Sequence, residues 1–185
     1  MIVTFFLSLP RSRTAWLSLY LTGMGVPCFH ELWRDVSTIA EFKRAIEQKG
    51  PGPVANADCS NWFFVPELRE AFPDAQFILI DRLHDDVWRS AHDAYGGDLV
   101  PLWDAYARVQ QHPPPLVGTI SFETWDQHVS RELMALVGPG IPFNDEWHTR
   151  LHQLEVQITP QRVAEDVEMG RTGQLTHLAR RMTEQ

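Results

Sequence analysis

The chain has 185 residues, of which 44% are hydrophobic, and it carries a formal net charge of −8. This length and composition suit one folded domain over residues 1–185 and exclude an intrinsically disordered chain. The negative charge argues against a general nucleic-acid binder, so any anion site must be a local concentration of positive charge.

The cysteines and the apolar segments favour a cytoplasmic protein without a membrane partner. Cys28 and Cys59 form no CxxC pair and match no metal spacing, which predicts two reduced thiols. The apolar stretch over residues 2–7 is too short for a signal peptide and runs into Pro-Arg instead of a small-residue cleavage site. No segment approaches the length of a transmembrane helix.

Hydrophobic periodicity and turn residues predict alternating strands and helices. In chain order they are a strand over residues 2–7, a helix over 14–23, a strand over 26–30, a helix over 36–48, a strand over 53–58, a helix over 62–72, a strand over 75–81, helices over 85–95 and 98–111, a strand over 116–122, and helices over 124–137 and 144–156. The polar tail over residues 160–185 is predicted to be helical, with interruptions at Gly170 and Gly173. This alternation predicts an α/β domain with a sheet of about five parallel strands.

The segment SLPRSRTAWL leads from the first predicted strand directly into a helix. A helix N-terminus presents free backbone N–H groups and a positive dipole end, and Arg11, Ser12 and Thr14 add side-chain donors there. The GxxxxGK[ST] motif of ordinary ATP- or GTP-hydrolysing loops is absent, and no Gly-Lys pair occurs in the chain. The simpler alternative is a solvated turn in which Ser12 or Thr14 caps the helix.

Three stretches together resemble the sulfotransferase family. SLPRSRTAWL resembles its 5′-phosphosulfate loop, of the form [LY]-P-[RK]-S-G-T-[ST]-[WL]-L. FVPELREAFPDAQFILIDRLHDDVWRSAHD is similar to the family strand that runs into an arginine with a serine eight residues later, here Arg82 and Ser90. LVGTISFETWDQHVSRELMALVG is a weaker match to a later strand, helix and turn, so that the resemblance spans residues 1–138.

The resemblance implies a fold, a reaction and a donor. The fold is a three-layer α/β sandwich with a parallel sheet like that of the P-loop nucleotide kinases. The reaction is the transfer of a sulfuryl group from 3′-phosphoadenosine 5′-phosphosulfate (PAPS) to an acceptor hydroxyl or amine, which releases 3′,5′-bisphosphoadenosine (PAP) and needs no metal. The acceptor is expected to be a small molecule or a glycan.

The resemblance also implies which residues hold the donor. Arg82 and Ser90 would bind its 3′-phosphate, and the loop would cradle its 5′-phosphosulfate through Arg11, Ser12, Arg13, Thr14, Ala15 and Trp16. The competing interpretation of Arg82 is a surface salt bridge with Asp81, Asp85 or Asp86. The seven tryptophans are otherwise expected in the core, apart from Trp33, which is placed to line an acceptor pocket. The stretch Gly170-Arg171-Thr172-Gly173 is a thin match to the family loop that closes over the 3′-phosphate.

The resemblance also implies a base for the acceptor proton, because family members use either a histidine near the third strand or a glutamate shortly after the second strand. This chain has His30-Glu31 at the latter place. Our hypothesis is that Glu31 is the base and that His30 supports or replaces it. Adjacent strand residues point to opposite faces, so only one of the two would face the site. Cys59 stands where relatives commonly have lysine, so Arg11 or Arg13 would have to stabilise the transferring group.

Two departures from the family pattern keep other functions open. Arg13 stands where the family usually has glycine, and it either adds a charge contact or crowds the site. The chain is short for the family, so the acceptor pocket is either open or completed by a second subunit in a homodimer. The alternatives are a kinase-like phosphotransferase, disfavoured by the missing Gly-Lys, and a non-catalytic nucleotide-binding member of the fold.

Overall fold

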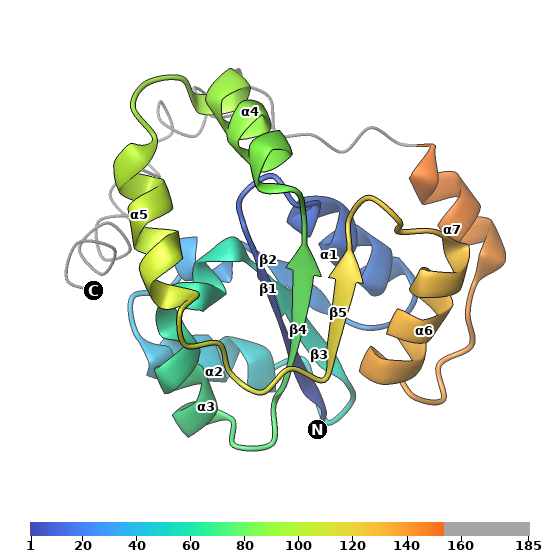
Figure 1. The fold of residues 1–185 in the computed structure, drawn as a ribbon. Helices are drawn as coiled ribbons and strands as arrows, with labels where there is room; N and C mark the ends of the chain where they lie inside the picture. The colour runs from blue at the N-terminus through green and yellow to red at the C-terminus, as the bar shows by residue number, and fades with distance from the viewer. Residues whose placement is uncertain (154–185) are drawn as a thin grey trace.

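The computed structural model describes residues 1–153, and its centre is a five-stranded sheet. All strand pairs are parallel, and the order is β2-β3-β1-β4-β5 (Figure 1). The strands are β1 (Val3–Ser8), β2 (Cys28–His30), β3 (Val54–Ala57), β4 (Gln76–Asp81) and β5 (Gly118–Ser121). The predicted class, an α/β domain with a five-stranded parallel sheet, is confirmed.

Helices cover both faces of the sheet and give a three-layer sandwich. They are α1 (Thr14–Gly23), α2 (Ile39–Glu47), α3 (Val65–Ala71), α4 (His84–Tyr95), α5 (Val100–Val109), α6 (Gln127–Val137) and α7 (Asp145–His152). Two short 3₁₀ helices, η1 (Leu32–Arg34) and η2 (Cys59–Phe64), follow β2 and β3. No helix among the described residues is both long and apolar enough to cross a membrane.

The side chains of β1 alternate between the two faces of the sheet, which explains why two hydrophobic cores form. Val3, Phe5 and Leu7 face one core, which they share with residues of α2, α3, α4 and α5. Phe6 faces the opposite core, built with residues of α1, α6 and α7. Successive strand residues point to opposite faces, so a continuously apolar strand serves two layers at once. Figure 1 shows α2, α3 and α5 on one side of the sheet and α1, α6 and α7 on the other.

The helix predicted over residues 62–72 was wrong in its first three residues. Asp58 accepts a hydrogen bond from the Ser60 N–H at 2.9 Å and starts the 3₁₀ helix η2. The α-helix α3 begins only at Val65, with Pro66 in its first turn. Proline lacks an N–H and suits the first turn of a helix, so the chain changes from 3₁₀ to α geometry there.

Some expectations lie outside the described residues. These are the tail helix over 160–185, the loop over 170–173 and the end of the helix predicted over 144–156.

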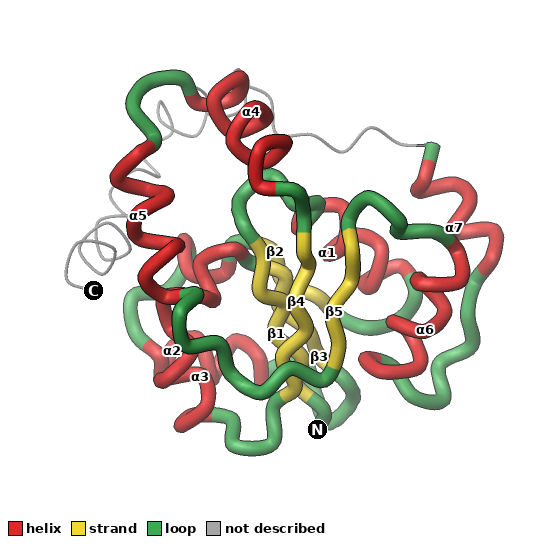
Figure 2. Tube along the Cα trace, in the orientation of Figure 1, coloured by secondary structure: helices red, strands yellow, loops and turns green. Residues whose placement is uncertain are grey.

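The strand order reverses direction between the ends of β1 and β4. The chain leaves β1 towards β2 and β3, whereas it leaves β4 towards β5 on the other side. In open α/β sheets such a reversal opens a crevice at the carboxyl ends of the two strands, where ligands bind. The loop after β1 and the turn after β4 both lie at this edge (Figure 2).

Candidate functional site

The loop between β1 and α1 has an unusual backbone. Outside glycine, positive φ among the described residues is found only at Arg11 (φ 67°), Arg13 (φ 61°) and Glu31 (φ 56°). Two of the three lie in this one loop, and L-residues adopt such angles at a cost in free energy. Strained backbone that persists in a fold is concentrated at ligand sites, which directs attention to this loop.

Arg13 occupies the N-cap position of α1, and its side chain makes no capping hydrogen bond. The alternative in which Ser12 or Thr14 caps the helix is therefore wrong. The left-handed angle at Arg13 explains why glycine would suit this position. The Arg13 guanidinium lies 4.9 Å from the Phe122 ring centroid and 5.6 Å from that of Trp16, so cation–π contacts hold it against aromatic rings.

The loop and the helix after β4 meet through Arg11 and Ser90. Arg11 Nε donates a hydrogen bond to Ser90 Oγ at 3.2 Å. The Arg82 guanidinium, in the turn between β4 and α4, donates to the main-chain oxygen of Arg11. Figure 1 shows the loop after β1 passing beneath α4, as these contacts require. The structure thus brings Arg11, Arg82 and Ser90 together from segments about 70 to 80 residues apart.

Arg82 is held away from the acids beside it. Within the described part of the chain it makes no ion pair with Asp81, Asp85 or Asp86, so the surface salt bridge is not formed. Its guanidinium carbon lies 4.2 Å from the Phe122 ring centroid. Burial lowers the pKa of Arg82, with Arg11 and Arg13 adding to that effect and Asp86 and Glu123 opposing it. Several arginines therefore share one crevice, which creates local positive charge in an acidic chain.

Several buried polar atoms at the ends of β1 and β4 have no hydrogen-bond partner among residues 1–153. Ser12 is 0% exposed, and its Oγ has no hydrogen-bond partner among the described residues. The same holds for Ser8 Oγ and for Arg82 Nε in this part of the chain. Buried polar groups are almost always hydrogen-bonded, because leaving them unpaired costs free energy. Together with the free N–H groups of the first turn of α1, at Thr14 and Ala15, these atoms fit an anionic ligand.

His30, the last residue of β2, contacts the same loop. Its Nε2 lies 3.2 Å from Thr14 Oγ1, the first residue of α1. Burial lowers the pKa of His30, Glu31 opposes this shift, and Arg34 adds to it. His30 therefore faces the loop as a neutral imidazole near neutral pH.

Glu31 lies directly after β2 and pairs with Arg34 of η1. Its side chain is half-buried. The neighbouring strand β3 ends next to a second carboxylate, Asp58, which is only 2% exposed. Burial raises the pKa of Asp58 to about 6, and the charge of Glu31 adds to the increase. Asp58 accepts hydrogen bonds from the Ser60 N–H at 2.9 Å and from the Trp33 N–H at 3.5 Å, so it links η1 to η2.

Tyr95 was missed in the sequence. It is 45% exposed at the end of α4, and Gly96 and Gly97 follow it, both with positive φ. Partial burial raises the pKa of the Tyr95 phenol, while the nearby Arg11 guanidinium lowers it. The paired glycines that end the helix were the available signal, since they mark a tight exit after the tyrosine.

Trp16 and Trp33 belong to the core. Trp16 is 4% exposed and stacks on Tyr20 at a ring distance of 4.8 Å. Trp33 is 1% exposed, lies between Phe42 and Phe64, and donates from Nε1 to Asn61 at 3.1 Å. The expectation that Trp33 lines an acceptor pocket was wrong, because aromatic stacking within the core takes up both faces of its ring.

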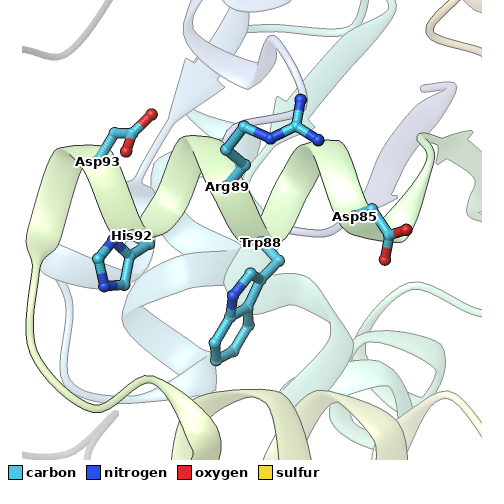
Figure 3. Close-up of a pocket in the computed structure, with 5 residues that line it drawn as sticks. All are labelled: Asp85, Trp88, Arg89, His92 and Asp93. Carbon is cyan, nitrogen blue, oxygen red and sulfur yellow. The ribbon is translucent and has the colours of Figure 1, made fainter.

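A separate cavity of about 380 Å³ lies beside α4. Its lining includes Asp85, Trp88, Arg89, His92 and Asp93 (Figure 3). Trp88 and His92 project from one side of the helix, and Arg89 and Asp93 project from the other. None of the predicted donor residues is in this set, so the cavity is distinct from the crevice at Arg11 and Ser90.

No cluster of His, Cys, Asp or Glu suited to a metal ion is found in residues 1–153. A family model described as a sulfotransferase domain matches residues 4–134, which include the loop, the His30-Glu31 pair, Arg82 and Ser90. A comparison with curated proteins found no significant match.

Proposed function

Because the chain belongs to the sulfotransferase family, we propose that it transfers a sulfuryl group from PAPS to a hydroxyl or amine of a small-molecule or glycan acceptor. The observation that carries the proposal is the convergence of Arg11, Arg82 and Ser90 at the crevice between β1 and β4. PAPS has about four negative charges, and such a ligand needs concentrated positive charge in a protein whose net charge is −8.

The residues present fit both anionic ends of this donor. Arg82 and Ser90 hold the 3′-phosphate, and Arg82 Nε, which has no hydrogen-bond partner within the described part of the chain, supplies an N–H for it. The 5′-phosphosulfate is bound by the Arg11 guanidinium, the Ser12 hydroxyl and the free N–H groups at the start of α1. Ser12 Oγ then gains the partner that it lacks among the described residues. Arg13 and Trp16 support the loop from behind, through the contact of the guanidinium with the ring.

The donor supplies an activated sulfuryl group, and the reaction is an in-line displacement at sulfur. The acceptor oxygen or nitrogen forms a bond to sulfur while the bond from sulfur to the bridging phosphate oxygen breaks, and PAP leaves with the electron pair. Glu31 takes the proton of the acceptor, and its pairing with Arg34 holds the carboxylate in place. Arg11 stabilises the charge that develops on the leaving phosphate, since electrostatic stabilisation dominates transfers of this type.

The direct test uses PAPS labelled with ³⁵S and a panel of hydroxyl and amine acceptors, with PAP release followed by chromatography. We expect label to move to at least one acceptor with one PAP formed per transfer, in the absence of a divalent metal. Transfer of phosphate from ATP in the same panel, or binding of PAPS without any transfer to any acceptor, would overturn the proposal.

A further inference from the structure

The contact between His30 and Thr14 joins the edge strand to the donor loop. His30 ends β2, and Thr14 begins α1, so the 3.2 Å contact between Nε2 and Oγ1 connects two segments of the site. Thr14 lies in the first turn of the helix, directly after the left-handed Arg13. Its hydroxyl is therefore at the point where the loop presents its N–H groups to an anion.

This hydrogen bond has a direction that chemistry can decide. A neutral imidazole has one N–H and one acceptor nitrogen, and a threonine hydroxyl has one proton to donate. If Thr14 donates to Nε2, no proton remains for a bound anion. Anionic oxygens only accept hydrogen bonds. Thr14 can therefore donate a hydrogen bond to the nucleotide only if its own oxygen accepts the hydrogen bond from His30.

We propose that His30 is a positioning residue whose Nε2–H donates to Thr14 Oγ1 and so directs the Thr14 proton towards the 5′-anionic end of the nucleotide donor. This inference rests on the proposed function of the site. It gives His30 a role in donor binding and leaves the acceptor proton to Glu31. His30 thus acts on the donor side of the transferred group, because it contacts the donor loop. Glu31, which is paired with Arg34, acts on the acceptor side.

A double-mutant cycle on the affinity for PAP tests the coupling. Calorimetric titration should show that His30→Phe, which keeps a ring but has no donor, weakens PAP binding roughly 10-fold. Thr14→Val should weaken it by a similar factor, and the double variant should be no weaker than either single variant. His30→Gln, which retains an N–H, should recover part of the affinity. His128→Phe is the control, because His128 is exposed on α6.

A spectroscopic measurement tests the direction of the bond without any variant. In the ¹⁵N spectrum of the PAP-bound wild type, Nε2 of His30 should carry the proton and Nδ1 should not. The ¹⁵N spectrum also determines the direction of the His30–Thr14 hydrogen bond if His30→Phe fails to fold.

The outcomes separate this inference from the function on which it rests. Wild type that does not bind PAP would overturn the proposed function and this inference with it. Wild type that binds PAP, combined with additive effects in the cycle or an unprotonated Nε2, would overturn the role of His30 alone.

Discussion

Glu31, the base in the proposed reaction, is held in one place by its backbone and its ion pair. It lies in the left-handed region with φ 56°, just beyond the last residue of β2, and its carboxylate pairs with Arg34 three residues later. Such an angle costs free energy in a non-glycine residue, so the surrounding structure must hold it. The pairing and the backbone together fix the direction of the carboxylate.

We predict that Glu31→Gln lowers the turnover of PAPS about 100-fold or more while the affinity for PAP stays unchanged. The amide keeps the volume and the contact to Arg34 but cannot take a proton. Steady-state rates with an acceptor that the wild type sulfates, together with PAP titration, give the two numbers. Glu47→Gln is the matched control, because Glu47 pairs with Lys43 on the exposed surface of α2. Full turnover by Glu31→Gln would show that another group is the base.

At the scale of elements, the start of α1 is shaped by an arginine where glycine would cost less. Arg13 has φ 61° at the N-cap, and its guanidinium contacts Phe122 and Trp16. The cation–π contacts of the Arg13 side chain therefore stabilise the folded protein, whereas the left-handed backbone of the same residue destabilises it. Arg13→Ala removes the cation–π contacts and keeps the backbone strain. Arg13→Gly also removes the contacts, but it relieves the strain.

Arg13→Gly should therefore be more stable than Arg13→Ala by about 1 kcal/mol in the free energy of unfolding. Urea denaturation of the two variants beside wild type measures the difference. Equal stability of the two variants would contradict the left-handed conformation at this position.

The short helices η1 and η2 are linked by Asp58, whose carboxylate accepts from the Trp33 and Ser60 N–H groups. Its pKa in the folded protein is raised to about 6 from the ordinary 3.8, mainly by burial. The folded state thus holds a proton at pH values where the unfolded state has released it. Asp58 consequently lowers the free energy of unfolding as the pH rises from about 4 to about 6.

We predict that Asp58→Asn removes this part of the pH dependence. The stability of the variant relative to wild type should increase by about 2 kcal/mol between pH 4 and pH 7, whatever the offset from changed hydrogen bonds. Thermal or urea unfolding at several pH values measures it, with Asp104→Asn on the exposed surface of α5 as control. Parallel curves for wild type and Asp58→Asn would rule out the raised pKa.

For the whole molecule, the sequence predicts the elements better than their arrangement. The apolar runs at β1 and β4 are unambiguous because both strands are buried between helical layers. The order β2-β3-β1-β4-β5 depends on which strands pair across long separations, and local patterns carry no such information. The 3₁₀ helix η2 was missed because a capping carboxylate and a proline, both local, compete with an apolar pattern that also suits an α-helix.

The sequence likewise predicts some features of the candidate site and not others. The spacing of Arg82 and Ser90 was readable from the sequence, and the structure joins both to Arg11. The contact of His30 with Thr14 was not readable, because it follows from the position of β2 at the edge of the sheet, two strands away from β1. The cation–π contacts of Arg13 and Arg82 with Phe122 depend on β5 lying beside β4, so they could not be predicted from the sequence either.

The charge of the whole molecule bears on the selectivity of the proposed donor site. The net charge of −8 disfavours polyanions in general, whereas within residues 1–153 Arg11, Arg13 and Arg82 form a local positive cluster at the ends of β1 and β4. In the proposed function, a nucleotide with phosphates on both its 3′ and 5′ sides would use Arg82 and Arg11 together, whereas a 5′-diphosphate would use the loop alone.

The most direct test of this account is calorimetric titration of the wild type with PAP and, separately, with ADP and Mg²⁺. We predict binding of PAP in clear preference to Mg-ADP, weakened roughly 10-fold or more by Arg82→Ala and unchanged by Arg69→Ala on the exposed face of α3. Preference for Mg-ADP, absence of PAP binding, or PAP binding that survives Arg82→Ala would contradict the donor site at the crevice between β1 and β4.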